Sequence, residues 1–340
     1  MTHIAPLRLR LDGDALASNW RWLNVTSGAA ACGAAVKANG YGLGAVEVVK
    51  RLAEAGCRDF FVATWAEALE VEPYLPEGGG LSVLHGVRAE DMDMALASRA
   101  RPVLNTIEQV ARWRQTGRPC DVMVDTGMNR LGLGGADELS GLSIHTLLSH
   151  LASADEDVAQ NARQLEAFRA FSGEVLAQRL SLANSAGICL GGDYHFGLTR
   201  PGLALYGGIP RDEAKGGIRP VVALETQVLQ RRRIAAGESI GYNATFTADR
   251  PMELAIVNLG YADGYLRGFS GRGSACGGAL GVVGRVSMDL VALDVTGAPS
   301  IAEGDWIGMD FDLPAASAQS GLSQYELLTL LGCRFDRLWA

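Results

Sequence analysis

One lysine of the sequence stands where its amine could act as a nucleophile. Lys37 follows directly on the apolar run 29–36 (AAACGAAV), which predicts a buried strand, and precedes the turn-forming residues 39–42 (NGYG). If that strand belongs to a β/α barrel, Lys37 lies at the C-terminal face, where such barrels carry their chemistry. Burial there lowers the pKa of an amine and makes it a usable nucleophile. Lys37 is therefore the first candidate catalytic residue.

Further polar residues stand at the ends of other short apolar runs. They are Arg130, His150, Ser185 and Arg200. Each of them alone has an ordinary explanation, such as a surface ion pair, a satisfied core histidine or a helix cap. Together with Lys37, however, they bring a lysine, two arginines, a histidine and a serine to the strand ends of one face. Coincidence explains such a set poorly, so the pattern indicates an active site.

The serine of this set and a nearby glycine indicate what that site binds. Barrels commonly hold a phosphate between the loops that follow their last two strands, through backbone N–H groups and small residues. Ser185 and Gly202 fall in those loops. A phosphate there and an amine at Lys37 describe a cofactor with a phosphate at one end and an aldehyde at the other. Pyridoxal phosphate fits that description.

The first two-thirds of the chain alternate apolar runs with amphipathic stretches, which predicts a parallel sheet with helices between its strands. The predicted strands are 29–36, 59–64, 81–85, 102–104, 120–125, 142–150, 180–184 and 203–208. The predicted helices are 45–56, 65–72, 90–97, 106–116 (capped by Asn105) and 155–179. About eight repeats favour a closed (β/α)8, TIM-like barrel over an open sheet. No G-x-G-x-x-G follows the first strand, which argues against a dinucleotide.

After residue 219 the pattern changes to short strands separated by Gly, Asp and Pro turns. The predicted elements are strands at 221–229, 252–259, 280–286, 290–295 and 306–309 and a helix at 323–331. The sequence therefore predicts two domains: an α/β barrel over residues 1–219 and a mostly-β C-terminal domain over residues 220–340.

Composition excludes several classes of partner. The net charge of −8 argues against nucleic acid or an anionic membrane as partner. No apolar run is long enough to span a bilayer, and the N-terminus does not resemble a signal peptide, so we expect a cytoplasmic protein. The 6 cysteines are scattered without metal-ligand spacing, so we expect reduced thiols and no metal site. The 43 glycines predict many tight turns or close backbone approaches.

Ordered blocks of the sequence resemble the alanine racemases, a family of pyridoxal-phosphate enzymes. The segment 35–42 (AVKANGYG) is similar to their cofactor attachment motif. Further blocks follow in the family's order along nearly the whole chain: DTGMNRLG (125–132), SHLASADE (149–156), ANSAG (183–187), RPGLALYG (200–207), GYNATFTA (241–248), GYADGYLR (260–267), VGRVSMD (283–289) and SQYELLTLLG (323–332).

The resemblance implies roles for the matching residues. The catalytic pair would be Lys37, covalently joined to the cofactor, and Tyr242, supplied by the partner subunit of a homodimer. The cofactor-binding set would be Lys37, Tyr41, His150, Ser185, Arg200, Gly202 and Tyr325, with Arg200 at the ring nitrogen. The substrate carboxylate would meet Arg130 and the backbone of Met288. The substrate entryway would be lined by Asp155, Arg267 and Arg285.

The implied reaction interconverts L-alanine and D-alanine, the latter a precursor of peptidoglycan. Racemisation removes the Cα proton from one face and returns a proton to the other, so it needs two bases on opposite faces. The resemblance assigns the D-isomer's face to Lys37 and the L-isomer's face to Tyr242. An arginine at the ring nitrogen, unlike an aspartate, discourages ring protonation and weakens the electron sink.

Some positions depart from the family pattern. Met123 stands where many members carry a modified lysine that orients the arginine matching Arg130, and Ser181 stands where many carry a relay histidine. Gly40, Leu43 and Phe246 replace commoner residues without removing a catalytic group.

Three other functions are compatible with parts of this pattern. A serine or broad-specificity racemase would share the cofactor and the fold. A related decarboxylase of basic amino acids needs a cysteine from the second domain, and Cys276 and Cys333 lie outside any matching motif. A non-catalytic cofactor carrier would be a single barrel, which the second domain argues against.

Overall fold

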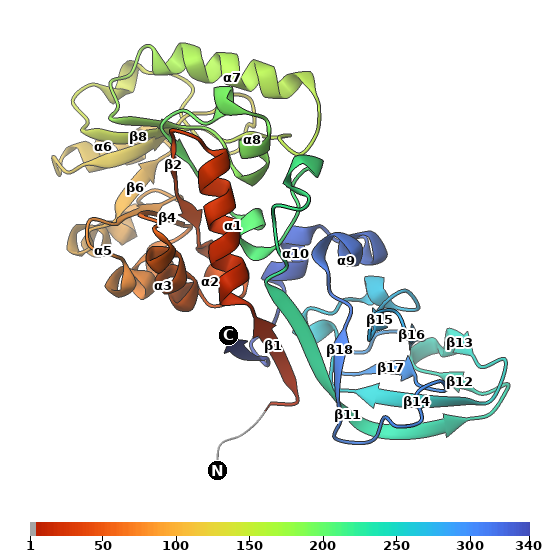
Figure 1. Cartoon of the computed structure of the whole chain (residues 1–340). Helices are drawn as coiled ribbons and strands as arrows, with labels where there is room; N and C mark the ends of the chain where they lie inside the picture. The colour runs from red at the N-terminus through yellow and green to blue at the C-terminus, as the bar shows by residue number, and fades with distance from the viewer. Residues whose placement is uncertain (1–4) are drawn as a thin grey trace. The chain divides into compact units, whose positions relative to one another are not determined.

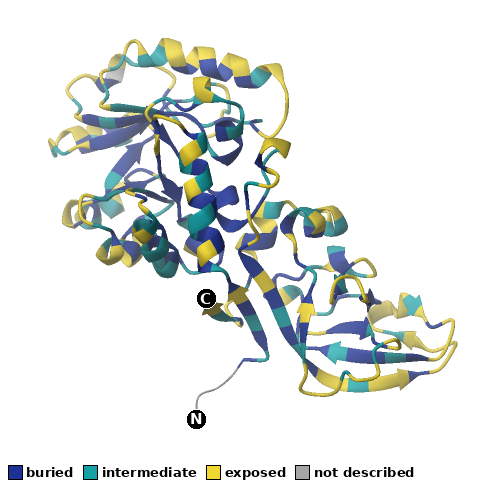
Figure 2. Ribbon diagram, viewed as in Figure 1, coloured by how far each residue is buried: buried dark blue, intermediate teal, exposed yellow. Residues whose placement is uncertain are grey.

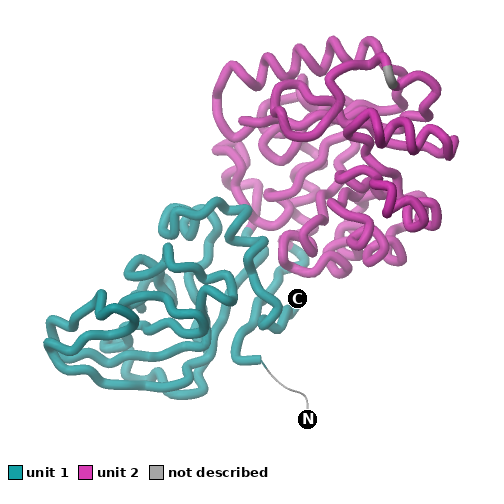
Figure 3. Tube along the Cα trace, turned by 180° about the vertical axis from the view of Figure 1, so that it is seen from behind, with its two compact units in different colours: residues 1–14, 220–340 teal, residues 15–219 magenta. Residues whose placement is uncertain are grey.

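The computed structural model describes residues 5–340, apart from the side chain of Glu138. The chain forms two compact units (Figure 3). One unit is Ala15–Arg219, and the other combines the residues up to Asp14 with Pro220–Ala340. The division after residue 219 lies where the change in sequence pattern placed it.

The N-terminal residues belong to a different unit from the one predicted. The expected first domain began at residue 1, but β1 (Leu7–Leu11) pairs antiparallel with β11 (Val222–Ile234) and parallel with β19 (Asp336–Trp339). Strand pairing between segments so distant in the chain leaves no local signal, so residues 5–14 could not be assigned from the sequence alone.

Parallel strands close into a barrel within residues 15–219 (Figure 1). Seven of them lie side by side in chain order: β3 (Ala34–Ala35), β4 (Asp59–Val62), β5 (Gly80–Val83), β6 (Arg101–Leu104), β7 (Cys120–Met123), β8 (Ile144–Leu148) and β9 (Arg179–Ser181). The eighth, β10 (Leu198–Thr199), pairs in parallel with β2 (Ala31–Cys32), which leads into β3. The Gly197 and Arg200 N–H groups donate to the Leu180 and Ala183 carbonyls, which joins β10 to β9. The predicted barrel is confirmed.

Helices alternate with these strands and pack their apolar faces on them (Figure 2). For example, α3 (Ala45–Ala55) buries Val48, Val49 and Leu52, and it ends at Gly56, whose φ of 117° favours glycine. The other α-helices of this part of the chain are α1 (Gly13–Thr26), α2 (Lys37–Tyr41), α4 (Trp65–Val71), α5 (Met92–Ala97), α6 (Ile107–Arg114), α7 (Ala159–Ser172) and α8 (Ser185–Cys189).

The eighth strand lies earlier in the chain than predicted. It is β10, and the expected strand 203–208 is instead a short 3-10 turn, Leu203–Tyr206, which ends at Gly207. The apolar residues of that turn are all buried, and a short buried apolar run in the sequence is also typical of a strand, which is why the prediction was wrong. Arg200 consequently follows the eighth strand, rather than leading into it, and lies at the C-terminal mouth of the barrel.

Two helix predictions also need correction. The helix α7 is shorter than the predicted 155–179, and Thr106 rather than Asn105 caps α6. The Thr106 side chain accepts from the Gln109 N–H, whereas the Asn105 amide donates to two backbone carbonyls. Polar residues at the ends of an amphipathic stretch fit either helix or loop, so periodicity left both boundaries open.

The second unit is built on one eight-stranded sheet in the order β14-β17-β16-β15-β18-β11-β1-β19. The 13-residue β11 pairs with β1 and β18, and from Val228 onward it pairs with β14, with an irregularity between Val228 and Gln230. The remaining elements are β12 (Ser239–Ile240), β13 (Phe246–Thr247), β14 (Met252–Val257), β15 (Ser274–Ala275), β16 (Leu280–Val283), β17 (Val291–Asp294), β18 (Trp306–Met309), α9 (Leu313–Ser320) and α10 (Gln324–Thr329). The prediction of a mostly-β domain is confirmed.

Among residues 5–340, no helix has the length and apolar character that crossing a membrane requires.

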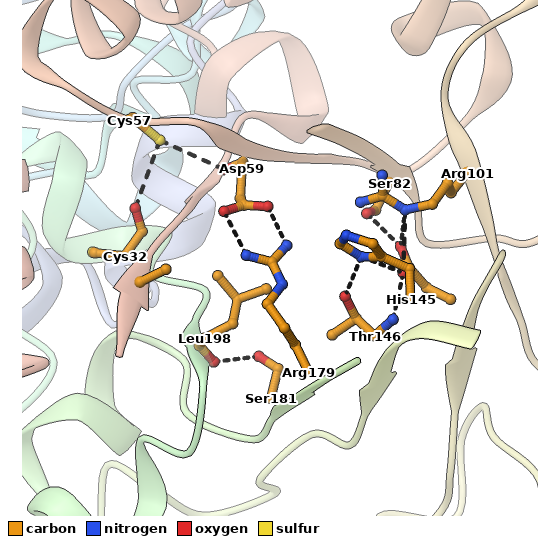
Figure 4. Close-up of polar contacts among 12 residues, drawn as sticks. Cys32, Cys57, Asp59, Ser82, Arg101, His145, Thr146, Arg179, Ser181 and Leu198 are labelled. Atoms are coloured by element: carbon orange, nitrogen blue, oxygen red, sulfur yellow. Dashed lines mark hydrogen bonds and ion pairs between the residues drawn. The ribbon is translucent and has the colours of Figure 1, made fainter. Parts of the chain in front are cut away.

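A polar cluster inside the barrel centres on Asp121 of β7, which is fully buried. Its partners Ser82, Arg101, His145 and Thr146 are shown in Figure 4. The Asp121 carboxylate accepts from the Ser82 hydroxyl at 2.6 Å and from the Thr146 N–H at 2.9 Å. The Arg101 guanidinium lies 3.3 Å from it and the His145 ring 3.6 Å from it. Burial alone raises the pKa of Asp121, but the His145, Arg101 and Ser82 contacts outweigh burial and lower it.

A second ion pair, between Asp59 and Arg179, lies beside this cluster (Figure 4). Gly80 separates the two pairs: a Cβ there would lie 3.1 Å from Arg101 and 3.3 Å from Asp59. Charged groups of both signs therefore fill this layer of the barrel interior in place of apolar side chains.

Replacing Asp121 by asparagine tests how much the barrel depends on this cluster. We expect Asp121→Asn to lower the free energy of unfolding by about 3 kcal/mol, because the partly buried Arg101 loses its counter-ion and the Ser82 hydroxyl loses a charged acceptor. Urea unfolding followed by circular dichroism measures the change. The difference should shrink as the pH falls, because the native carboxylate has a lowered pKa and its protonation removes the same charge from the unmodified protein.

Asp193→Asn is the matched control. Asp193 pairs with Arg169 but its side chain is 77% exposed, so its loss should change stability by less than about 1 kcal/mol. Equal effects of the two substitutions would contradict the importance given to the buried cluster.

Candidate active site

A left-handed turn after β3 places Lys37 at the mouth of the barrel. Residues 38–41 all have φ between 53° and 61°. Only glycine adopts this conformation freely, and every other residue in it costs about 1–2 kcal/mol. Contacts must therefore hold the turn, and one comes from Asn39, whose Oδ1 accepts from the Ala45 N–H at 3.0 Å. Strain of this kind concentrates at functional sites.

The same turn brings Tyr41 against Gly202. The Tyr41 ring stacks on Tyr206 with 4.6 Å between ring centroids. A Cβ on Gly202 would lie 2.2 Å from the Tyr41 hydroxyl oxygen, closer than any side chain allows. Position 202 therefore requires glycine, as long as Tyr41 keeps this place.

The loops after β9 and β10 meet at Ser185. This serine is buried at the N-terminus of α8, and its Oγ accepts from the N–H groups of Gly202 at 2.9 Å and Ala204 at 3.2 Å. Backbone N–H groups and a hydroxyl that converge in this way form a cradle for an anion such as a phosphate. The pattern of small residues predicted a phosphate site at this place.

Positive charge gathers around Lys37. Burial and the charges of Arg130 and Arg200 lower the pKa of Lys37, against an opposing effect of Glu67. Burial and the same cations lower the pKa of His150 to about 3, so this imidazole is neutral at physiological pH. The site therefore combines an amine that loses its proton readily with an excess of fixed positive charge, which suits an anionic ligand.

Arg200 is buried and rigidly held. Its Nη1 donates to the Ser181 hydroxyl and its Nη2 donates to the Ser149 carbonyl at 2.6 Å. Ser181 in turn donates to the Leu198 carbonyl, so its oxygen faces Arg200 as an acceptor. Burial lowers the pKa of Arg200 to about 10, and the charge of Asp121 opposes that shift. Ser181, at the position expected to carry a relay histidine, thus serves as a fixed hydrogen-bond acceptor for Arg200.

Arg130 follows a tight loop after β7 and is exposed. The Asp125 Oδ1 builds this loop by accepting from the N–H groups of Gly127, Met128 and Asn129 at 2.9–3.1 Å. Met123, at the end of β7, is only 9% exposed and supplies an apolar surface. With methionine at position 123, the Asp125 loop is what sets the backbone that carries Arg130. Asp155 lies in the exposed loop after β8.

In the second unit, Tyr242 and Arg285 lie on neighbouring segments. Tyr242 is 64% exposed and follows Gly241, whose Cβ position lies 3.8 Å from the Arg285 backbone nitrogen. The two residues after Tyr242 have positive φ, so this loop also holds strained backbone.

Met288 and Arg267 belong to two other loops that meet. The Ala262 N–H donates to the Met288 carbonyl at 3.0 Å, and the Arg267 guanidinium lies 5.1 Å from the centre of the Tyr261 ring. Tyr325 lies on α10 and is 43% exposed. In the barrel unit the structure thus brings Lys37, Tyr41, His150, Ser185, Arg200 and Gly202 to one end of the strands. In the second unit it joins the Tyr242 loop to Arg285 and the Met288 loop to that of Arg267, whereas Asp155 and Tyr325 are placed by their loop and helix alone.

Sequence reasoning overlooked Glu67 and Asp121, which both act electrostatically on this site. A signal for Glu67 was present, because Thr64-Trp65-Ala66-Glu67 has the spacing of a helix capping box. Asp121 had no such signal, since only the closed barrel shows that it lies inside.

Sequence models of two domains match the chain. The alanine racemase N-terminal domain matches residues 11–210, and the alanine racemase C-terminal domain matches residues 221–339. Two relatives from Agrobacterium fabrum are named alanine racemase, biosynthetic (41% identical, covering 98% of this chain and 93% of that protein) and alanine racemase, catabolic (40% identical, covering 97% and 91%).

A solved structure is also similar over its whole length. The alanine racemase from Bartonella henselae, with covalently bound pyridoxal phosphate, superposes with a TM-score of 0.92 at 34% identity. The match covers 99% of this chain and 100% of that one.

The contact between Tyr41 and Gly202 makes a prediction about ligand binding. Gly202→Ala should weaken the binding of pyridoxal phosphate by roughly tenfold or more, a loss of at least ~1.4 kcal/mol, because the new methyl group displaces Tyr41 from the phosphate cradle. Titration of the cofactor-free protein, followed by absorbance, measures the affinity.

Gly192→Ala is the control for this substitution, since a Cβ there meets no atom within 4 Å. It should leave the affinity unchanged. If Gly202→Ala binds the cofactor as tightly as Gly192→Ala does, the cradle does not depend on this contact.

Proposed function

The chain belongs to the alanine racemase family, and from this premise we propose how its own residues interconvert L- and D-alanine. It is a pyridoxal-phosphate-dependent alanine racemase, an isomerase. The observation that carries the proposal is the barrel mouth itself, where the half-buried Lys37 lies among cations beside the anion cradle at Ser185. The relatives named biosynthetic and catabolic match about equally, so the similarity identifies the reaction and not its cellular use.

The residues present fit pyridoxal phosphate. The Ser185 hydroxyl, the Gly202 N–H and the Tyr41 hydroxyl converge where a phosphate needs donors, and no side chain at position 202 fills that space. Lys37 offers an amine for the aldehyde. When bound, the cofactor withdraws electrons from the substrate Cα and so acidifies its proton.

Two residues exchange protons with the substrate Cα. We assign the D-isomer's face to Lys37, because a lowered pKa leaves more of its amine unprotonated and able to accept a proton. We assign the L-isomer's face to Tyr242, supplied by the partner subunit of a homodimer. The strong exposure of Tyr242 on its own chain supports a role in another subunit's site.

The remaining residues bind and orient. Arg130 and the Met288 backbone would hold the substrate carboxylate, and the neutral His150 would lie against the cofactor ring, where it adds no charge. Arg200 would donate to the cofactor's ring nitrogen. A guanidinium there would disfavour protonation of that nitrogen, which would limit electron withdrawal and so discourage side reactions.

The other parts of the proposal concern access, assembly and location. Asp155, Arg267 and Arg285 line the substrate entryway, Tyr325 completes the phosphate site, and the protein acts in the cytoplasm as a homodimer. The six cysteines are all free, which supports a reducing compartment.

Substrate preference is tested directly. Purified protein incubated separately with L-alanine, L-serine and L-lysine should convert alanine fastest, because the family's substrate is alanine. Chiral chromatography measures each D-isomer. Turnover of serine or lysine well above that of alanine would contradict the preference for alanine and would favour a serine or broad-specificity racemase instead.

A shared active site is tested by mixing two inactive variants. Lys37→Ala and Tyr242→Phe should each be nearly inactive alone. If subunits exchange at random, half the dimers are hybrids, and each hybrid has one intact site out of two, so about a quarter of the original activity should return.

Mixing Lys37→Ala with itself is the control and should recover nothing. Hybrid dimers that form, as native mass spectrometry would show, but remain inactive would mean that Lys37 and Tyr242 do not belong to one shared site.

A further inference from the structure

Glu67 lies at the start of α4 and faces the segment that carries Lys37. Its backbone N–H donates to the Thr64 hydroxyl at 3.3 Å, and its Oε2 accepts from the Thr64 N–H at 3.2 Å. These reciprocal bonds form a helix capping box. Oε2 also accepts from the Ala63 N–H at 2.6 Å, which ties the helix to the end of β4.

The second carboxylate oxygen has a different partner. Oε1 accepts from the Ala38 N–H at 2.7 Å, and Ala38 is the residue immediately after Lys37 and the first of the left-handed turn. A capping box needs only one oxygen of its glutamate. Glu67 therefore joins two neighbouring strand ends of the barrel, one of which carries the catalytic lysine.

No cation neutralises this carboxylate by direct contact. Within residues 5–340 Glu67 has no ion pair, and its hydrogen-bond donors are backbone N–H groups. The charged groups that act on Lys37 are Arg130 and Arg200, which lower its pKa, and Glu67, which raises it. His150, the other titratable group of the cluster, is neutral.

We propose that Glu67 is a positioning residue for Lys37: it fixes the left-handed turn that presents the amine and supplies the negative charge that offsets Arg130 and Arg200 there. The proposal rests on the proposed function, in which Lys37 exchanges protons with the substrate. An amine that must take up a proton as well as lose one cannot be surrounded by positive charge alone, because such surroundings would make it too weak a base.

The test measures the titration of Lys37 in cofactor-free protein. Only the neutral amine adds to the aldehyde of pyridoxal phosphate, and water leaves as the C=N bond forms. The rate of cofactor uptake, followed by absorbance, therefore rises with pH until Lys37 is neutral and then reaches a plateau. The cofactor's own titrations are common to all variants, so differences between the pH curves report on the protein.

Three variants are compared with the unmodified chain. Glu67→Gln keeps the size and removes the charge, and Glu67→Asp keeps the charge but shortens the reach to Ala38. Glu72→Gln is the matched control at the other end of α4, where the Glu72 carboxylate accepts from the Arg99 N–H at 2.9 Å and the Ser98 hydroxyl at 2.6 Å, outside the site.

We expect the uptake curve to move to lower pH in Glu67→Gln, to move less in Glu67→Asp and to stay in place in Glu72→Gln. Each uptake rate is first divided by the plateau rate that the same variant reaches at alkaline pH. On the acidic side of the curve, this relative rate should be higher in Glu67→Gln than in the unmodified chain, by tenfold for each pH unit that the curve has moved. Damage to the fold alone would slow uptake at every pH and would not produce this gain.

Curves of Glu67→Gln and Glu72→Gln that coincide would overturn the proposal and leave Glu67 as a helix cap. If Glu67→Gln does not fold, a Glu67→Asp curve that coincides with that of the unmodified chain overturns it equally. A failure of the proposed function gives a different result. In that case the unmodified chain takes up the cofactor but does not racemise alanine.

Discussion

In the proposed reaction the amine of Lys37 loses a proton and regains it, and this requirement constrains the rest of the barrel mouth. Burial and the charges of Arg130 and Arg200 drive the amine toward its neutral form, while Glu67 acts in the opposite sense. None of these groups is adjacent to Lys37 in the chain. The closed barrel brings them together because the C-terminal ends of its parallel strands meet on one face.

The contacts of Arg200 show how the barrel keeps a cation available to a ligand. Its guanidinium is held by neutral acceptors, the Ser181 hydroxyl and the Ser149 carbonyl, while the carboxylate that supports its charge, Asp121, belongs to the polar layer deeper in the barrel. A directly paired carboxylate would neutralise the charge that the site offers to an anionic cofactor. The buried polar layer therefore serves the site as well as the stability of the barrel.

Much of the fold and of the site could be predicted because the signals were local. The run 29–36 ended at Lys37, the small residues at Ser185 and Gly202 marked two loops that do meet, and the change of pattern at residue 219 marked the division into two units. Errors arose where one local pattern fits two structures. The buried turn Leu203–Tyr206 has the apolar character of a strand, and only the pairing of β10 with β2 shows which segment closes the barrel.

The sequence by itself determined the chemistry: a lysine after a buried strand, small residues for a phosphate and tyrosines in recognisable blocks. Tertiary structure alone decided which charges act on that lysine and which strands share a sheet. Glu67 illustrates the difference. Its capping box with Thr64 can be recognised in the sequence because the two residues are three positions apart, whereas its hydrogen bond to Ala38 joins positions 29 residues apart. Electrostatic balance depends on distances in space, and the chain must close its barrel before those distances exist.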